Sequence, residues 1–475
     1  MKKTFVGIFF TVCTLFIFIR ADAAPKSYDG YIVRLKNNCD TVMLSSLNDY
    51  PYNGSELEVI NAENRLFHID DINNLPEYIS EEDIEHIEPD YDIYLFDTPN
   101  DSYASAWFMK NIHASAAWET GCHGEDIRIA VIDSGVSKHN DITKNLVEGY
   151  NFINNTKDTT DTYFHGTFVS GIIAAQANNS FALAGLAYNA KIVPLKCFDG
   201  ENSQLSYMIK AIYAAVNTYN CKVLNISAGT EQYSSELENA VKYAVSKGAV
   251  VVAASGNHDN KKTFNCPYYP ASFDCVVSVG SVNQKNNISY FSNYNEYVDI
   301  VAPGESIVSL ANDSDSGLKQ ASGTSFAAPF VSAAAAICLN INPDITYSDF
   351  LTLLEQASVD LGDEGKDIYY GNGLLNMENI VDKLLEGKDF FVSPFDFESD
   401  SPSAVVYNNT DSEQNVFSIW SQEYTKQLEK LTLQPKSGAY ICLTPSADSF
   451  TNYIWSMNLK PLEKTVYYTP PKLSN

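Results

Sequence analysis

The sequence predicts an α/β fold, a doubly wound and mainly parallel sheet with helices on both faces. Two observations indicate it. Between residues 98 and 386, short apolar runs alternate with amphipathic segments, which is typical of strands and helices that follow one another. The run Val250-Val251-Val252-Ala253-Ala254 is apolar at every position, as a strand covered on both faces requires. We expect strands at 128–133, 191–196, 222–228, 250–254, 276–282 and 298–301, and helices at 165–176, 205–219, 234–247, 325–339 and 347–357.

Two smaller units are expected on either side of this domain. Residues 26–97 open and close with strand-like runs and carry 17 acidic residues against four basic ones, so we expect a small acidic α+β unit. Residues 387–475 lose the helical period. Their short aromatic and β-branched runs are separated by Pro, Asn, Ser and Asp, which predicts a small all-β domain.

The first 23 residues have the pattern of a cleaved signal peptide. A basic start is followed by an uncharged apolar run at residues 4–19 and by the small residues Ala21 and Ala23. A transmembrane anchor is the alternative, but this run is short for a hydrocarbon core of ~30 Å. The other long apolar run, residues 325–341, is expected to be a buried helix. We therefore expect a secreted, extracellular protein with no membrane anchor after signal cleavage.

The charge balance excludes one class of partner. Lys and Arg number 31 against 59 Asp and Glu, giving a formal net charge of -28. Such a surface repels phosphate backbones, so nucleic acid is not expected as a partner. The nine cysteines contain no C-x-x-C spacing, which makes a zinc site improbable.

Three reactive side chains stand where a strand is expected to end or a helix to begin. Asp133 closes an apolar strand, His165 starts a helix of small residues, and Ser325 starts an alanine-rich helix. Each alone has an ordinary explanation as a turn residue, a solvated histidine or an N-cap. Together they supply a nucleophile, the base that activates it and the carboxylate that orients the base. Asn257, just after a core strand, and the Ser325 N–H could both donate to the oxyanion.

A different serine-hydrolase fold can be excluded from the order of these residues. The stretch from Gly323 to Ala327 is close to the nucleophile elbow of lipases and esterases. That fold places its histidine after its serine. All seven histidines precede Ser325, so this hypothesis fails.

Residues 98–386 resemble the subtilisin-like serine peptidases. The motifs that carry the resemblance, in the family's order, are Ala130-Val-Ile-Asp133-Ser-Gly-Val, His165-Gly-Thr, Asn225-Ile-Ser-Ala-Gly, Ala253-Ala-Ser-Gly-Asn257, Val301-Ala-Pro-Gly and Gly323-Thr-Ser325-Phe-Ala-Ala-Pro. The resemblance implies a triad of Asp133, His165 and Ser325, with Asn257 in the oxyanion hole. It implies a serine endopeptidase that forms an acyl-enzyme on Ser325 and needs no cofactor for catalysis.

The sequence departs from the family at two positions. Phe168 and Phe330 stand where relatives often have histidine. Neither position is catalytic, so the implied activity is unaffected.

The resemblance also implies where a protein or peptide substrate lies. An extended peptide would add as a strand beside Ser227, Ala228 and Gly229, with residues 200–202 on its other side. Ala254 and Tyr268 would wall the primary pocket. A tyrosine there would shorten the pocket and favour small or medium apolar side chains, unless Tyr268 turns outward.

Residues 26–97 resemble the family's inhibitory propeptide, which implies a zymogen that removes this segment itself near residues 96–98. The negative charge of the segment could instead be a solvated face without regulatory meaning. We expect the chain to be a monomer, with its own propeptide as an intramolecular inhibitor.

A structural calcium ion is a further expectation from the resemblance. Two carboxylates, one amide and nearby backbone carbonyls are ligands that suit Ca²⁺. The side chains are those of Asp101, Asp141 and Asn179, and the carbonyls those of Ala177, Phe181 and Leu183. Asp and Asn are also common in surface turns without any metal.

Two other hypotheses remain open at this point. A catalytically silent relative would bind proteins through its groove or its β domain, and would not react with a fluorophosphonate. A processing peptidase would cut few sequences in a peptide library, whereas a scavenging one would cut many.

Overall fold

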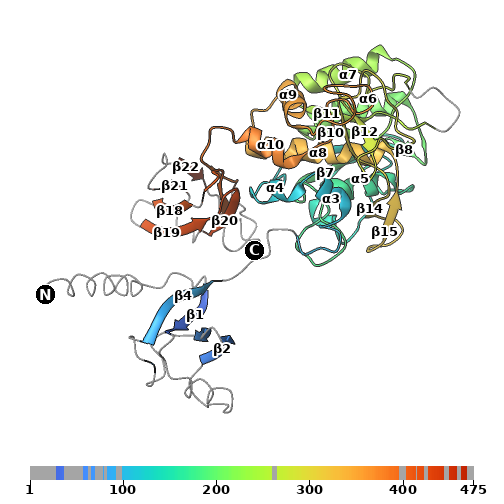
Figure 1. The fold of residues 1–475 in the computed structure, drawn as a ribbon. Coiled ribbons are helices and arrows are strands. Elements are labelled where there is room, and N and C mark those ends of the chain that lie inside the picture. Colours follow the sequence, from blue (N-terminus) through green and yellow to red (C-terminus); the bar gives the residue numbers. More distant parts are fainter. Residues whose placement is uncertain are drawn as a thin grey trace, which may run out of the picture. The chain divides into compact units, whose positions relative to one another are not determined.

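The computed structural model describes residues 28–36, 57–61, 66–69, 79, 83–91, 99–258, 265–394, 403–412, 414–421, 426–442, 449–456 and 462–467 (Figure 1). The chain divides into two compact units, Met1–Leu95 and Phe96–Asn475. The expected signal peptide at 1–23 and the expected cleavage region at 96–98 lie outside the described residues.

The N-terminal unit contains an antiparallel sheet of four strands in the order β2-β3-β1-β4. Its strands are β1 (Tyr28–Leu35), β2 (Leu57–Asn61), β3 (Leu66–Ile69) and β4 (Ile84–Tyr91). Alternate residues of β1 and β3, namely Val33, Leu35, Phe67 and Ile69, are buried. This alternation gives the sheet one face packed on a core.

The second unit is built on a sheet of seven strands in which every neighbouring pair is parallel. In the order β13-β12-β11-β10-β5-β7-β6, these are Ile300–Pro303, Val277–Val282, Val250–Ala254, Val223–Ile226, Arg128–Asp133, Lys191–Lys196 and Tyr150–Asn151. The predicted doubly wound α/β fold is confirmed. Strand order reverses on the two sides of β5, and in such sheets ligands bind beyond the carboxyl ends of the strands at that point.

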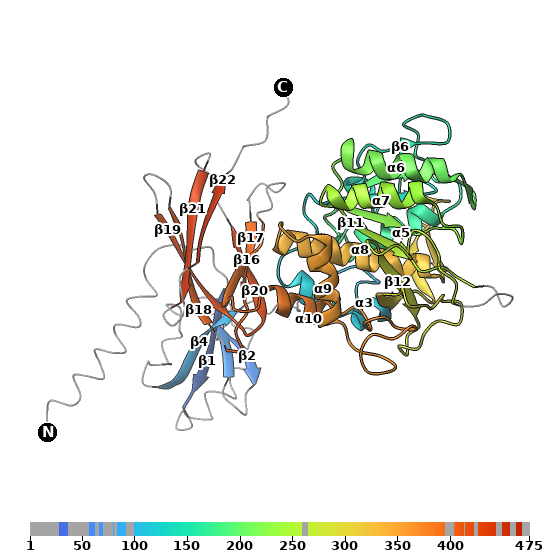
Figure 2. The same ribbon diagram turned by 90° about the horizontal axis from the view of Figure 1, so that it is seen from above.

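Helices cover both faces of this sheet (Figure 2). Helices α5 (His165–Ala174) and α8 (Thr324–Ile341) lie on one face, and α6 (Leu205–Asn217) and α7 (Ser235–Ser246) on the other. In β11, Val250 and Val252 enter the core with α5 and α8, whereas Val251 and Ala253 enter the core with α6 and α7. The strand is apolar throughout because both of its faces are buried.

Helix α8 passes through the centre of the molecule. Within the described part of the chain, it is the helix long and apolar enough to cross a membrane, but 89% of its apolar window is buried inside the structure. The burial identifies a core helix, as the alanine-rich sequence predicts.

Shorter elements complete this unit. They are α3 (Trp107–Asn111), α4 (Ala114–Trp118), η3 (Thr143–Asn145), α9 (Tyr347–Ala357), α10 (Met377–Leu384) and the hairpins β8–β9 (Phe198–Asp199, Asn202–Ser203) and β14–β15 (Ile307–Leu310, Leu318–Ala321). The strand expected at 222–228 ends earlier, at Ile226, so the residues after it leave the sheet.

The C-terminal residues form two antiparallel sheets, which confirms a small all-β region. The first contains β16 (Phe390–Val392), β17 (Ser403–Asn408) and β20 (Ser437–Cys442), and the second contains β18 (Gln414–Ser421), β19 (Lys426–Leu433), β21 (Ser449–Ser456) and β22 (Leu462–Tyr467). The first sheet packs closely on the α/β domain. Tyr407 belongs to the main hydrophobic core, and a Cβ on Gly121 would lie 2.6 Å from the Cβ of Val405.

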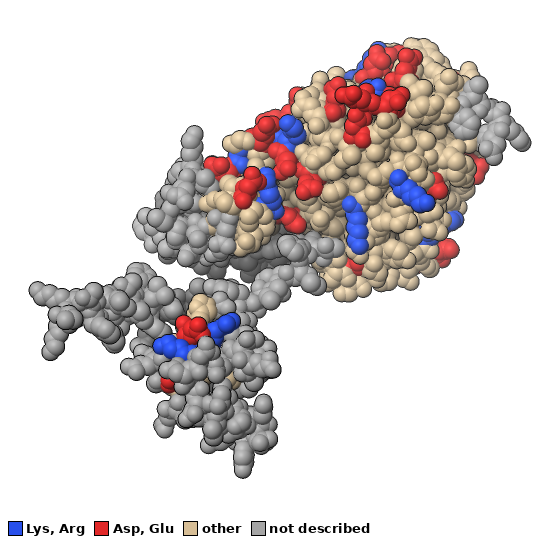
Figure 3. Space-filling view, in the orientation of Figure 1, with Lys and Arg blue, Asp and Glu red and all other residues tan. Residues whose placement is uncertain are grey.

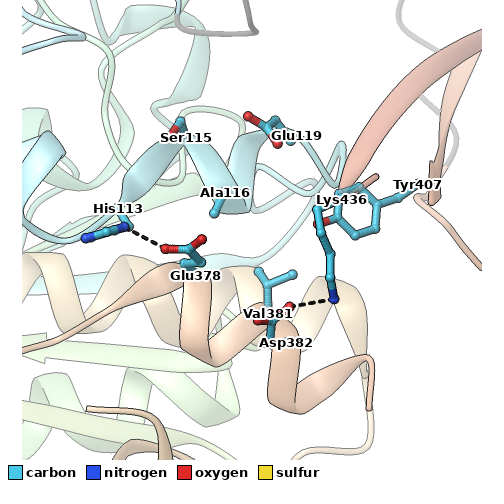
Figure 4. Close-up of a pocket in the computed structure, with 9 residues that line it drawn as sticks. All are labelled: His113, Ser115, Ala116, Glu119, Glu378, Val381, Asp382, Tyr407 and Lys436. Carbon is cyan, nitrogen blue, oxygen red and sulfur yellow. Dashed lines mark hydrogen bonds and ion pairs between the residues drawn. The ribbon is translucent and has the colours of Figure 1, made fainter. Parts of the chain in front are cut away.

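A polar hollow lies where this sheet meets α4 and α10 (Figure 4). Two ion pairs cross it, from His113 to Glu378 at 2.8 Å and from Lys436 to Asp382 at 3.1 Å. Its lining does not include Asp133, His165 or Ser325.

The face of the molecule shown in Figure 3 carries Asp and Glu side chains in several groups, with Lys and Arg between them. This distribution agrees with the formal net charge of -28.

Candidate active site

The carboxylate of Asp133 and the imidazole of His165 form the centre of the site. Asp133 is the last residue of β5 and His165 is the first residue of α5. His165 Nδ1 lies 2.9 Å from both carboxylate oxygens, and the Ser134 N–H donates to Asp133 Oδ1 at 2.7 Å. A Cβ on Gly166 would lie 2.1 Å from the carbonyl oxygen of Gly135, so this approach of helix to strand requires glycine.

The environment of His165 favours its protonated form. Burial lowers the pKa of His165, but the charge and hydrogen bond of Asp133 and the charge of Asp161 raise it, and the net direction is upward. Since the carboxylate faces Nδ1, this nitrogen carries the proton in the neutral ring. Nε2 is then left as the basic nitrogen, as a general base requires.

Ser325 stands in the first turn of α8 and is tied to Ser227 by two hydrogen bonds. Ser325 Oγ donates to the carbonyl oxygen of Ser227 at 3.1 Å, and Ser227 Oγ donates to the carbonyl oxygen of Ser325 at 2.8 Å. The second bond has a clear origin. Pro329 lies four residues further along the helix and has no N–H, so the Ser325 carbonyl lacks its helical partner. Ser227 satisfies this carbonyl instead.

The amide of Asn257 is fixed beside the same helix start. Its Oδ1 accepts from the Thr324 N–H at 2.8 Å and from Thr324 Oγ1 at 3.0 Å. Both bonds use the oxygen, which leaves Nδ2 as the donor for a ligand. A Cβ on Gly323 would lie 3.3 Å from Nδ2, so glycine keeps space open in front of the amide.

These groups meet at one edge of the sheet. The ring of Phe326, the residue after Ser325, lies 5.3 Å from the His165 ring between centroids. The Asp133–His165 pair is therefore a neighbour of the start of α8, where Ser325 stands and where Asn257 is bound. Catalytic hydrogen bonds are often formed only in the substrate complex, so the bond from Ser325 to Ser227 is compatible with transfer of the proton to His165.

Tyr268, which is expected to wall the primary pocket, lies against two glycines. A Cβ on Gly229 would lie 2.8 Å from Tyr268 Cε1, and one on Gly256 would lie 3.1 Å from Tyr268 Cγ. The ring therefore lies against both glycines. The tyrosine is turned inward rather than outward.

The residues expected to line a substrate strand lie beyond the carboxyl end of β10. Ser227, Ala228 and Gly229 follow β10 directly and have left the sheet. The exposed hairpin β8–β9 carries Glu201, whose Oε1 accepts from the hydroxyl of Tyr163 at 2.5 Å. Tyr163 lies two residues before His165, so the hairpin is tied to the histidine loop.

The three side chains expected to hold calcium also lie together. Asp101 accepts from the N–H groups of Asn178, Asn179 and Phe181, and Asp141 accepts from Asn179 Nδ2 at 2.7 Å and from the Leu183 N–H at 3.0 Å. Burial and the charge of Asp101 raise the pKa of Asp141 to about 6, although hydrogen bonds from Asn179 and Leu183 oppose the shift. Within the described residues, no group of three or more His, Cys, Asp or Glu side chains is placed to hold a metal.

Two charged residues near the Asp133–His165 pair are absent from the sequence-based prediction. Asp161 is 3% exposed and Lys196 is 5% exposed. The sequence offers one signal for Lys196, a lysine at the end of an apolar strand. Asp161 gives no signal, since an aspartate in a polar loop is normally solvated.

The comparison with protein families decides the assignment. The model described as "Subtilase family" matches residues 124–373 of this chain, which is more than half of it. The chain belongs to the subtilase family. The predicted resemblance is confirmed, and the chain is a serine-type endopeptidase that acts on protein substrates. Subtilases need no cofactor for catalysis.

Individual relatives agree with this assignment. The chain is 36% identical over 302 residues to the thermophilic serine proteinase of Bacillus sp. strain AK1, covering 63% of this chain and 73% of the relative. It is 35% identical over 271 residues to the minor extracellular protease Epr of Bacillus subtilis strain 168, covering 57% and 40%. Among solved structures, one of proteases from Pseudoalteromonas arctica PAMC 21717 superimposes with a TM-score of 0.56 at 28% identity, covering 61% of this chain and all of that one.

Proposed function

We propose that this subtilase is a secreted endopeptidase that is made as a zymogen and cuts peptide bonds through an acyl-enzyme on Ser325. The observation that carries the proposal is the Asp133–His165 pair, with 2.9 Å from Nδ1 to both carboxylate oxygens, beside a serine at the first turn of α8. Residues 98–386 would form the catalytic domain and 387–475 the β domain.

Each group has a defined role in the first half of the reaction. The Ser325 hydroxyl exchanges its hydrogen bond to Ser227 for one to His165 Nε2 and attacks the peptide carbonyl as Nε2 takes its proton. The carboxylate of Asp133 stabilises the imidazolium that results. Asn257 Nδ2 and the Ser325 N–H donate to the oxyanion of the tetrahedral intermediate.

The second half of the reaction releases both products. The imidazolium of His165 gives its proton to the leaving amine, the carbon–nitrogen bond breaks, and an ester to Ser325 remains. Water then attacks this ester while His165 again takes a proton. The acid product leaves and Ser325 regains its hydrogen.

The packing of Tyr268 supports a preference for small side chains at the bond that is cut. Its ring lies against Gly229 and Gly256, in the space that the resemblance assigns to the substrate side chain. Glycine or alanine would fit above the ring without moving it. Ser227, Ala228 and Gly229 would pair with the substrate backbone, and Ala254 would complete the wall of the pocket.

The two N-terminal segments support the proposed zymogen and its export from the cell. Residues 1–23 would direct export, and 26–97 would act as an inhibitory propeptide that the enzyme removes near residues 96–98. The relative Epr of Bacillus subtilis is named an extracellular protease, which supports secretion. After processing we expect a monomer without a membrane anchor.

A calcium ion would suit Asp101, Asp141 and Asn179. Two carboxylates lie together in a buried place, and burial, with the charge of Asp101, raises the pKa of Asp141. The donor set therefore fits Ca²⁺, which would be structural and remote from the reaction.

The experiment compares the full-length chain with its Ser325→Ala variant after expression with export. N-terminal sequencing of the exported proteins should find the native chain trimmed near residue 97 and the variant still carrying its propeptide. A fluorophosphonate should label the native chain and not the variant. Ser348→Ala, which removes an exposed serine from α9, is the matched control and should behave like the native chain. Labelling that survives Ser325→Ala would disprove the proposed role of Ser325.

A further inference from the structure

A second buried carboxylate lies beside the proposed catalytic pair and has no part in the reaction described above. Asp161 precedes His165 by four residues and is 3% exposed. A buried carboxylate is unfavourable unless donors and positive charge compensate it. Its partners therefore indicate what it does.

Asp161 binds the loop that leads into α5. Its Oδ1 accepts from the N–H groups of Tyr163 and Phe164, each at 2.9 Å. Its Oδ2 accepts from the Thr167 N–H at 2.9 Å and from Thr167 Oγ1 at 2.7 Å. One carboxylate thus holds residues on both sides of His165.

The residue directly before His165 has an unfavourable backbone conformation. Phe164 has φ 100° and ψ -25°, in the left-handed region that residues with a Cβ rarely adopt. Phe164 is also the N-cap of α5 and offers no side-chain cap. Asp161 supplies the acceptors that this helix start lacks, and so compensates the conformation that directs the imidazole toward β5.

Asp161 is also linked to Asp133 through one residue, Ser134. Ser134 Oγ donates to Asp161 Oδ1 at 2.9 Å and accepts from the Gly166 N–H at 3.0 Å. The Ser134 N–H donates to Asp133 Oδ1 at 2.7 Å. Ser134 therefore joins the strand with the carboxylate to the helix with the imidazole.

A buried lysine completes the cluster. Lys196 Nζ donates to the carbonyl oxygen of Ser134 and, at 3.4 Å, to Thr162 Oγ1. Burial lowers the pKa of Lys196, and the charges of Asp161, Asp199, Asp158 and Asp133 oppose that shift. Of these aspartates, only Asp133 and Asp161 are buried.

The charges of the buried groups balance in only one state of the reaction. Asp133 and Asp161 are negative and Lys196 is positive, so a neutral His165 leaves one negative charge in excess. Ser325 and Phe326, the groups that α8 presents to the ring, carry no charge, and outside the buried cluster Lys319 Nζ lies 3.6 Å from the centroid of the Phe164 ring. Protonation of His165 brings the buried cluster to neutrality, which stabilises the imidazolium formed as Ser325 attacks.

We propose that Asp161 is a positioning residue for His165, which acts through Ser134 and the Phe164 backbone and favours the imidazolium by its charge. This inference rests on the proposed function, because it takes Asp133 and His165 as the catalytic pair. Asp161 touches neither substrate nor reacting atoms.

The main test is Asp161→Asn in the processed enzyme. We expect kcat on a peptide substrate to fall by about 10- to 100-fold, since small displacements of a catalytic group have effects of this size. KM should change little. The acid limb of kcat/KM against pH should move to lower pH, because a negative charge near His165 has been removed. The matched control is Asp158→Asn, which removes an exposed carboxylate from the same loop and should leave both quantities unchanged.

A second variant covers the case in which Asp161→Asn does not fold. Ser134→Ala keeps both carboxylates and Lys196 and removes only the link between them, so kcat should fall by about 5- to 10-fold with the acid limb nearly in place. Active-site titration with a fluorophosphonate normalises every rate to folded enzyme. A native pH profile and kcat in the titrated variants would overturn the inference. Full activity of His165→Ala would instead overturn the proposed function on which it rests.

Discussion

Two buried aspartates in the same domain have opposite surroundings. Asp133 is 3% exposed and faces the imidazole of His165, a group that can become positively charged. Asp141 is not exposed at all, but it meets only the neutral donors Asn179 and Leu183, with a second carboxylate, that of Asp101, nearby. Burial raises the pKa of Asp141 to about 6.

The difference shows how each site obtains positive charge. At Asp133 the chain provides the group that can carry the positive charge, the imidazole of His165, whose pKa is raised. At Asp141 the chain provides none, so a cation from solution would have to neutralise the two carboxylates. The first site is thus suited to chemistry and the second to stability, and single substitutions should separate the two.

The largest expected effect is on turnover. Asp133→Asn should lower kcat by about 10⁴-fold, a loss measured in other serine peptidases rather than derived from this chain, because the imidazole loses its orienting anion. The urea midpoint should change little, and the response to calcium not at all. Peptide hydrolysis and urea unfolding measure both. A native kcat in Asp133→Asn would contradict the catalytic role proposed for Asp133.

Calcium should have the second largest effect, and only on stability. At a concentration about 1,000 times its Kd, a bound ion adds about 4 kcal/mol to the free energy of unfolding. Chelation should therefore lower the unfolding midpoint while kcat of the folded enzyme stays the same. Asp141→Asn should abolish this calcium response, and Asp344→Asn, an exposed aspartate far along the chain, should retain it. An equal response in Asp141→Asn and the native chain would exclude the site.

Two quantities should depend on pH with opposite signs: the contribution of Asp141 to folding stability, and kcat/KM, which depends on His165. Without calcium, Asp141 releases its proton at about pH 6 in the folded state and near pH 4 in the unfolded state. Asp141 binds more protons in the folded state between these values, so the stability of the native chain relative to Asp141→Asn should fall by about 2 kcal/mol as pH rises from 4 to 6. Since the pKa of His165 is raised, kcat/KM should rise with pH and its limb should lie above about 6.5. A calcium-free stability, relative to Asp141→Asn, that rises between pH 4 and 6 would contradict the assignment at Asp141.

The smallest expected effect is on substrate preference and leaves calcium binding unchanged. Tyr268→Gly removes the ring from between Gly229 and Gly256, so hydrolysis after phenylalanine should improve by about 10- to 100-fold relative to hydrolysis after alanine. Tyr269→Phe, next to it, keeps a ring in place and is the control. The calcium response should be native in both variants. Unchanged preference in Tyr268→Gly would show that the ring does not limit the pocket.

The sequence predicts the core elements of the fold closely. Strand β11 and helix α9 have the predicted bounds, because continuous apolar runs and a regular helical period depend on local order alone. Helices α3, α4 and α10 were not predicted. They are short, and their order depends on packing against distant residues, which no local pattern records.

The same limit applies to the site. Asp133, His165, Ser325 and Asn257 are predictable because motifs mark them, and their placement around one edge is visible only in three dimensions. The two bonds between Ser227 and Ser325 join residues far apart in sequence. The hydrogen bonds of Asp161 depend on the backbone conformation of one strained residue, Phe164. Such contacts leave no periodic trace in the chain.

The all-parallel sheet has a consequence for how the enzyme reaches and keeps its native state. Every neighbouring pair of its strands must be brought together across a long connection, so loop-closure entropy is lost before many contacts form. Folding of such a topology is slow, because its transition state has a high free energy. The same barrier stands in the path of unfolding. Once assembled, the domain should unfold at a rate set by that barrier rather than by its equilibrium stability. Slow unfolding suits a peptidase, because a copy that opens transiently can be digested by its folded neighbours.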